Sequence, residues 1–229
     1  MNASRAGVFK MSLKEARYSA LIFWSIMIAV NLFLFILFTS LDNIDGEVNS
    51  AGVSPMYVYM FVSGIVGLRE SLPYALGMSV RRKDYFFGVK SAALCVAAGF
   101  ALFATLMAIV EEAVSGAFGI TNVRFFHAAW FDSVGVLGEL AAHFVFLSFF
   151  FALGFFFSLL QKRFGAVSLY LSGALLLVAI YGLHLLGAWP SIFRWLYGLD
   201  SILMFAVWLV PVAAAVAAAS YLLIRKATP

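Results

Sequence analysis

The chain has 229 residues, of which 64% are hydrophobic and only 11% are charged, whereas charged residues make up roughly 25% of an average soluble domain. This composition excludes an ordinary soluble protein and favours a membrane protein. The net charge of +4 follows from the membrane topology described below, so we do not expect nucleic acid as a partner.

Six apolar runs are long enough, or nearly so, to cross a bilayer as helices, which takes roughly 20 residues each. In chain order we place them at residues 19–38, 55–71, 88–110, 139–160, 166–187 and 201–224. The connections between the runs leave no room for a separate soluble domain. Residues 1–229 are therefore predicted to form one all-α membrane domain with six transmembrane helices.

Basic residues are concentrated in alternate connections between these runs. The amino-terminal stretch, the second-to-third connection, the fourth-to-fifth turn and the carboxyl-terminal tail hold every Lys and Arg except Arg124 and Arg194. Most of the acidic residues lie in the other connections. Because positively charged connections stay in the cytoplasm, both termini are predicted to be cytoplasmic.

A capping-box pattern, Ser12-Leu13-Lys14-Glu15, precedes the first apolar run. In a helix, Lys14 and Arg17 would share one face and the neighbouring apolar side chains another. This pattern predicts a short amphipathic amino-terminal helix that lies on the cytoplasmic leaflet and leads into the first span. The alternative is that these cations are ordinary charges flanking a span.

The connection between the second and third runs carries apolar residues where a plain loop would be polar. Ser71 is predicted to cap a short helix with Pro73 in its first turn, and Gly77 to end that helix in the left-handed conformation. Ser79 would then cap the third span. The exposed side of this short cytoplasmic helix would consist of Leu72, Tyr74, Ala75 and Leu76. Apolar residues kept in water are typical of a docking surface for a partner.

The stretch that continues from this connection into the third run has a recognisable pattern. It reads Pro73-Tyr74-Ala75-Leu76-Gly77-Met78-Ser79-Val80-Arg81-Arg82-Lys83-Asp84-Tyr85-Phe86. It resembles the P-[FY]-A-L-[GS]-x-[GS]-[VT]-x-R-[RK]-[DE]-[FY]-[FY] stretch of small bacterial permeases in the type-2 ABC (ATP-binding cassette) exporter family. The predicted spans, cytoplasmic termini and amino-terminal helix are similar to that family too.

This resemblance implies that the chain is the transmembrane permease subunit of an ATP-driven exporter in the bacterial cell membrane. In the family, the cytoplasmic connection contains a coupling helix that fits a groove on a separate ATPase subunit. The implied coupling residues are Leu72, Pro73, Tyr74, Ala75, Leu76 and Gly77, supported by Arg81, Arg82 and Asp84. The alternative for these three charged residues is that they simply flank the membrane interface.

The resemblance also implies that two permeases work with two ATPases, in contact with membrane lipids. Rows of small residues let helix backbones approach closely, which adds to the expectation of a dimer, either with a second copy or with a similar sister permease. These rows are Gly64 and Gly67 in the second span and Ala93, Ala97, Ala101 and Ala104 in the third.

No pattern for catalysis is found in the chain. It has no G-x-x-x-x-G-K-[ST] phosphate-binding loop and no G-x-S-x-G nucleophile turn. The three histidines fall on different elements without metal-ligand spacing, so no metal or cofactor is expected. The chain is therefore predicted not to be an enzyme, and ATP and Mg²⁺ would be bound by the partner ATPase.

Polar residues within the spans are few. Asn31, Glu139 and His143 could line a water-filled substrate path, although hydrogen bonding between helices is the favoured explanation. No Asp, Glu, Lys or Arg lies at the middle of a span, which argues against an ion-coupled transporter. The apolar bundle favours an amphiphilic substrate such as a lipid, peptide or hydrophobic drug. The alternative function is a non-transport scaffold or sensor subunit in the membrane.

Overall fold

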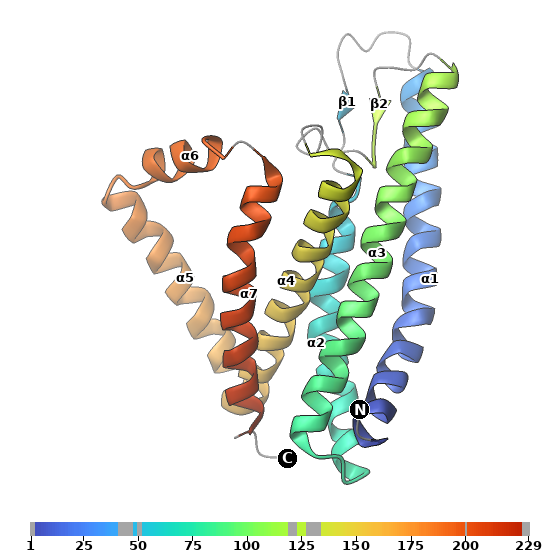
Figure 1. Cartoon of the computed structure of the whole chain (residues 1–229). Helices are drawn as coiled ribbons and strands as arrows, with labels where there is room; N and C mark the ends of the chain where they lie inside the picture. Colours follow the sequence, from blue (N-terminus) through green and yellow to red (C-terminus); the bar gives the residue numbers. More distant parts are fainter. Residues whose placement is uncertain are drawn as a thin grey trace.

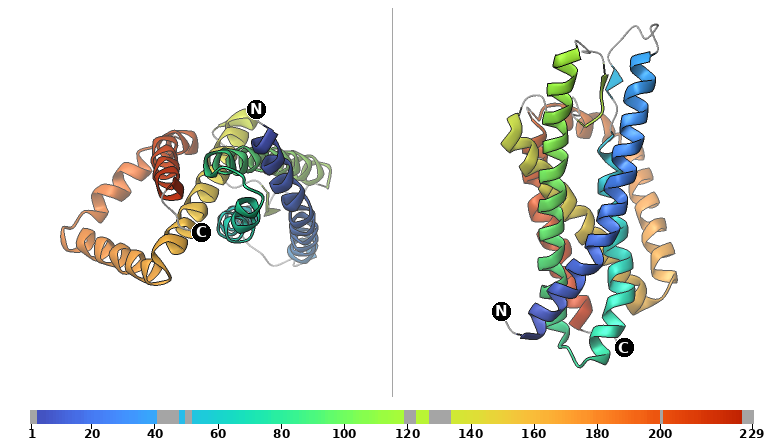
Figure 2. Two further views of the ribbon diagram at one scale, coloured as in Figure 1. Left: turned by 90° about the horizontal axis from the view of Figure 1, so that it is seen from below. Right: turned by 90° about the vertical axis from the view of Figure 1, so that its right-hand side faces the viewer.

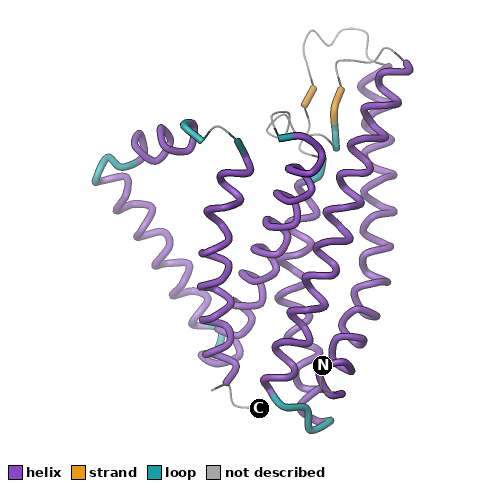
Figure 3. The backbone as a smooth tube through the Cα atoms, viewed as in Figure 1, coloured by secondary structure: helices purple, strands orange, loops and turns teal. Residues whose placement is uncertain are grey.

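The computed structural model describes residues 3–40, 48–49, 52–118, 123–126, 134–199 and 201–225, and these are almost entirely helical (Figures 1 and 3). The helices are α1 (Ala3–Ser40), α2 (Ser54–Gly77), α3 (Arg82–Phe118), α4 (Gly135–Phe164), α5 (Val167–Leu185), α6 (Trp189–Tyr197) and α7 (Ile202–Arg225). Two short strands, β1 (Val48–Asn49) and β2 (Val123–Arg124), pair in parallel. The all-α prediction is confirmed.

The long helices run between two ends of an elongated bundle. The first and last described residues, the α2–α3 turn and the α4–α5 turn lie at one end, which we call the basal end (Figures 1 and 2). The paired strands and α6 lie toward the opposite end, where α6 crosses from α5 to α7 (Figure 1). Helix α5 leans away from the bundle, and most of its side chains are exposed. Its apolar surface suits a lipid environment.

Five of the helices, α1, α3, α4, α5 and α7, are long and apolar enough to cross a membrane. This finding indicates a multi-pass membrane protein. Helix α2 has 24 residues, a length of about 36 Å, but it is not among these five, and it carries Arg69, Glu70 and several other polar residues. Its role as a sixth span stays a prediction.

The amino-terminal segment differs from the prediction of a separate short helix. Helix α1 continues without a break for 38 residues, or about 57 Å, well beyond the roughly 30 Å hydrocarbon core of a bilayer. Near its start, Val8 is buried against α3, where a Cβ added to Gly88 would lie only 2.9 Å from the Val8 Cβ. Packing against α3 thus holds this segment in line with the rest of α1.

The coupling segment is also not a separate helix. Helix α2 continues through Pro73 to Gly77, because Leu68, Leu72 and Ala75 form one buried face at helical spacing. Of the described residues near this end, Ser79, not Gly77, takes the left-handed conformation, with φ 59°. A substitution at Gly77 would therefore not oppose a left-handed backbone, and Ser79 is not the N-cap of α3, which begins at Arg82.

The end of α2 is a Schellman motif. The N–H of Val80 donates to the carbonyl of Ala75, and the N–H of Ser79 donates to the carbonyl of Leu76. Val80 also packs on the buried cluster that contains Ala75. The motif fixes the direction in which the chain leaves α2 and enters α3.

Replacing Ser79 with glycine is expected to stabilise the protein. A left-handed conformation costs a residue with a Cβ roughly 1 kcal/mol, which glycine does not incur. Ser79→Gly should therefore raise the midpoint of thermal unfolding in detergent, whereas Ser79→Val should lower it. An unchanged midpoint for both variants would show that this turn does not limit stability.

Helices α2 and α4 pack closely where glycine faces glycine. A Cβ on Gly64 would lie 2.5 Å from the Phe151 carbonyl oxygen, and a Cβ on Gly154 would clash with the Phe61 carbonyl. The alanines of the row in α3, Ala93, Ala97, Ala101 and Ala104, are buried within the chain as well. Gly64 and these alanines therefore pack inside one chain, whereas a Cβ on Gly67 would meet nothing within 4 Å, and the dimer stays a prediction.

Candidate functional site

The exposed part of the α2–α3 turn forms a small apolar surface with a basic rim. We define this basal surface as Pro73, Tyr74, Gly77 and Met78, together with Arg81 and Lys83. Tyr74 is 60% exposed and Met78 is 53% exposed. These two side chains are four residues apart and so share one face of the helix end. The basal surface therefore exposes an aromatic ring and a thioether, and the chain that leads from it into α3 carries two exposed cations.

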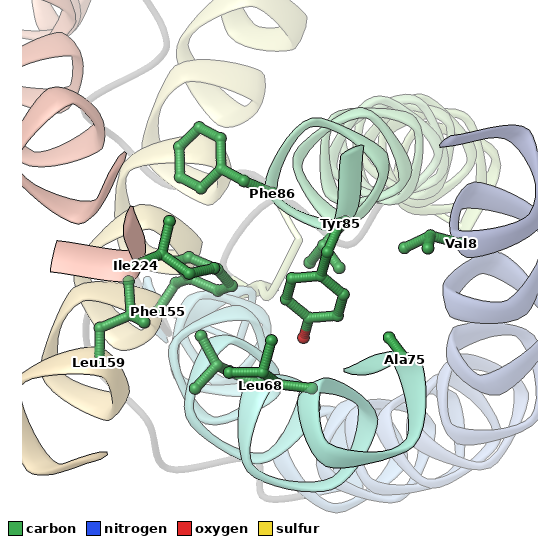
Figure 4. Packing of buried hydrophobic residues seen from close by; sticks show 10 residues of the cluster. Val8, Leu68, Ala75, Tyr85, Phe86, Phe155, Leu159 and Ile224 are labelled. Carbon is green, nitrogen blue, oxygen red and sulfur yellow. The ribbon is translucent and has the colours of Figure 1, made fainter. Parts of the chain in front are cut away.

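The opposite face of the same helix end is buried in a hydrophobic cluster (Figure 4). Leu72 and Ala75 belong to it, so they are not exposed docking residues as the sequence had suggested, and Leu76 is half-buried against it. The cluster joins five helices through Val8, Leu68, Leu72, Ala75, Tyr85, Phe86, Val89, Phe155, Leu159 and Ile224 (Figure 4). Its packing makes the turn a rigid support for Tyr74.

A buried hydrogen bond joins α2 to α3 beneath the basal surface. The hydroxyl of Tyr85 lies 2.7 Å from the Ser71 hydroxyl, which in turn donates to the Gly67 carbonyl. Because the Ser71 proton is used in that bond, Tyr85 donates to Ser71. The two hydroxyls satisfy each other within the apolar cluster and fix the angle between the two helices.

The three charged residues assigned to coupling have different surroundings. Arg81 is exposed at the turn, whereas Arg82 donates from Nη1 to the carbonyl of Arg225 at the end of α7, over 3.3 Å. Asp84 is half-buried in the first turn of α3, where its negative charge stabilises the helix by interacting with the helix dipole. Of the three, only Arg81 is exposed.

A second polar group lies between α2 and α4, away from the basal end. The hydroxyl of Tyr57 lies 2.7 Å from Nδ1 of His143, and Nε2 of His143 lies 3.5 Å from the Glu139 carboxylate. His143 and Glu139 are 0% and 4% exposed. If Tyr57 donates to Nδ1, the ring proton of His143 is on Nε2 and faces the Glu139 carboxylate, so that a donor faces an acceptor at each contact. The group links α2 and α4.

Asn31 is not part of this group, contrary to the predicted shared path. Its amide nitrogen donates to the Met27 carbonyl within α1, over 2.9 Å. Its amide oxygen lies toward Gly52, 2.5 Å from where a Cβ would be. The structure thus brings Glu139 and His143 together with Tyr57, which the sequence reasoning had missed, and leaves Asn31 in a separate polar contact.

Comparisons with known proteins do not identify the chain. No protein-family model, no curated protein and no solved structure matches it. Within the part of the chain that the structure describes, no group of three or more His, Cys, Asp or Glu side chains could hold a metal ion. The basal surface remains a candidate site because it keeps an exposed aromatic ring and thioether on a helix end whose other face is buried.

Proposed function

We propose that the chain is the transmembrane permease subunit of an ATP-driven ABC exporter. The observation that carries the proposal is the basal surface: an exposed Tyr74 and Met78 on a helix end whose other face is locked into the core by Leu72 and Ala75. A rigid support transmits a push from a docked ATPase to the helices, whereas a flexible loop would absorb it. The cluster beneath Tyr74 contacts α1, α3, α4 and α7, so such a push would reach most of the bundle.

In this proposal six helices cross the bacterial cell membrane, with α2 as the sixth and the basal end in the cytoplasm. The direction of α2 supports this topology, because it returns the chain from the far end of the bundle to the basal end (Figure 1). Its polar residues are compatible with this position, since several residues of α2 are buried against α3 and α4 and need no lipid contact. The basic connections lie at the basal end, as cytoplasmic ones do.

The topology predicts which introduced cysteines react from outside the cell. In a Cys95→Ser background, Ser191→Cys on α6 should react with an impermeant thiol reagent added to intact cells. Ser79→Cys at the basal end should react only after the membrane is opened. Both serines are exposed, so a difference in labelling reports the side of the membrane. Labelling of Ser79→Cys in intact cells would reverse the orientation and remove the basal surface from any cytoplasmic ATPase.

The partners in this proposal are two ABC ATPase subunits, which bind ATP and Mg²⁺, and a second permease, either a copy of this chain or a sister chain. The exposed apolar faces of α1, α5 and α7 would meet lipid or that second permease. The exported substrate is amphiphilic.

Co-purification tests the proposal against a scaffold or sensor role. The tagged chain is expressed with the ABC ATPase encoded beside its gene and extracted in mild detergent. We expect the ATPase to be retained, with ATP hydrolysis that rises when the chain is present in lipid. A chain that is well expressed but retains no ATPase would favour the scaffold or sensor alternative.

A further inference from the structure

A cavity of about 360 Å³ lies between α1, α2 and α3, with Phe151 of α4 at its back. This volume is within the range of small-molecule sites, roughly 300–1,000 Å³. Val62 and Val66 line it and are 47% and 42% exposed, so the cavity opens at the surface of the bundle. Asn31, Glu139 and His143 do not line it. It is separate from the path that the sequence had suggested.

The cavity follows one face of α2 from Tyr59 to Glu70, a length of about 16 Å. Tyr59 lies at its far end, where its ring stacks on Phe100 with centroids 5.0 Å apart and its hydroxyl lies 2.7 Å from that of Ser19. Between the two ends the lining is mostly apolar and includes Val62 and Val66, although Ser63 there is polar. The cavity is thus an apolar slot with an aromatic end.

The basal end of the slot is acidic. Glu15 of α1 and Glu70 of α2 line it there, and their negative charges repel each other. Neither carboxylate forms an ion pair with a basic residue of the described part of the chain, although this end of the bundle is rich in Lys and Arg. Among the described residues that line the slot, none is basic. Both glutamates are exposed, so the mouth presents two carboxylates with no described basic residue in its lining.

We propose that this cavity binds a single-chain amphiphile with a cationic amine head group. The ammonium would lie between Glu15 and Glu70, and the alkyl chain would follow the slot past Val62 and Val66 toward Tyr59. A small cation alone would leave the apolar slot unfilled, and the phosphate of a phospholipid would be repelled by the two carboxylates. Binding of this class does not require that the chain transport its ligand, so the inference is independent of the proposed function.

Photolabelling of the purified full-length chain in lipid nanodiscs tests this site. The probe is a twelve-carbon alkylamine with a diazirine at the end of its chain, and mass spectrometry locates the adducts. We expect labels on the slot-lining residues of α2 that excess dodecylamine prevents. Dodecanoate and phosphatidylethanolamine should not compete. Equal competition by dodecylamine and dodecanoate would overturn the cationic head group, and equal competition by ethylamine would overturn the requirement for a chain.

A cavity-filling variant tests the site, and a second glycine variant outside the slot is its matched control. Gly67 lines the slot, and a Cβ added there meets nothing within 4 Å, so Gly67→Leu fills the space without a clash against the backbone. Labelling should fall roughly tenfold or more. Gly99 on α3 has equally open surroundings but does not line the slot, so Gly99→Leu should label like the parent. Parent-level labelling of Gly67→Leu would overturn the site.

The acidic mouth is tested by neutral replacements of the same shape. The double variant Glu15→Gln/Glu70→Gln should label with the amine probe roughly tenfold less, since it loses two charge contacts with the ligand. An alcohol probe of the same length should label the variant and the parent alike. If the amine probe labels both proteins equally, the carboxylates do not hold the head group and the proposal is wrong.

Discussion

Gly154→Ala is expected to unfold or strongly destabilise the protein, although it adds only one methyl group. The new Cβ would clash with the carbonyl oxygen of Phe61 on α2, and a backbone atom cannot rotate away as a side chain can. Helices α2 and α4 would have to move apart along the contact that also includes Gly64. We expect a cost at or above the upper end of the roughly 1–3 kcal/mol typical of overpacking, measured as a lower midpoint of thermal unfolding in detergent.

The control for this prediction is Gly67, one helical turn after Gly64 on α2. Gly67→Ala adds the same methyl group where nothing lies within 4 Å. Because alanine favours a helix over glycine by roughly 1 kcal/mol, this variant should be as stable as the parent or slightly more stable. If Gly154→Ala and Gly67→Ala unfold at the same temperature, the close contact between α2 and α4 is not present in the membrane protein.

Tyr74→Asp is expected to release the ATPase without harming the fold. The ring of Tyr74 is largely exposed at the basal surface, so its loss leaves no cavity in the core. In a partner groove, the introduced carboxylate would be desolvated in a central contact, and changes of that kind commonly cost about 2 kcal/mol or more. That cost corresponds to roughly 30-fold weaker binding. The measurement is retention of the ATPase on the tagged chain, together with the rate of ATP hydrolysis by the complex.

Two control variants separate docking from general damage. Tyr74→Phe keeps the ring and should retain the ATPase, whereas Leu176→Val changes an exposed apolar residue of α5 far along the chain and should affect neither binding nor hydrolysis. All three variants should be expressed and extracted like the parent. Retention of the ATPase by Tyr74→Asp at the parent level would mean that the basal surface is only a connector between two helices.

Most of the helical framework could be predicted from the sequence, because long apolar runs have few alternatives in a membrane. The predicted second run, residues 55–71, lies within α2, and the fifth, residues 166–187, exceeds α5 by three residues in total. The basic connections of the sequence lie at one end of the bundle, as the alternation of charge requires.

The local details at the basal end could not be predicted, because tertiary burial overrides the short-range signals there. Pro73 is an ordinary sign of a helix start, yet the buried face of Leu68, Leu72 and Ala75 carries α2 through it to Gly77. Because of this burial, the end of α2 has one face in the core and one face exposed. Tyr74 stayed on the exposed face as predicted, whereas Leu72 and Ala75 did not.

The polar contacts between helices depend on the rotation of each helix, which the sequence does not determine. Tyr57 pairs with His143 from 86 positions away, and nothing in either run indicates the other. The slot had one visible sign: Glu15 and Glu70 are acidic residues in connections otherwise rich in Lys and Arg. The two residues could be assigned to one site only in the structure, where the packing of three helices brings both carboxylates to the mouth of the slot.

The central claim, that an ABC ATPase docks on the basal surface, is tested most directly by photocrosslinking in intact cells. A photoreactive amino acid replaces Tyr74 or Met78, and, as the control, Val58, which is similarly exposed but lies near the opposite end of α2. Our account predicts that the first two positions form an adduct with an ABC ATPase, identified by mass spectrometry, and that position 58 does not. Well-expressed variants that form no ABC ATPase adduct at either Tyr74 or Met78 would contradict it.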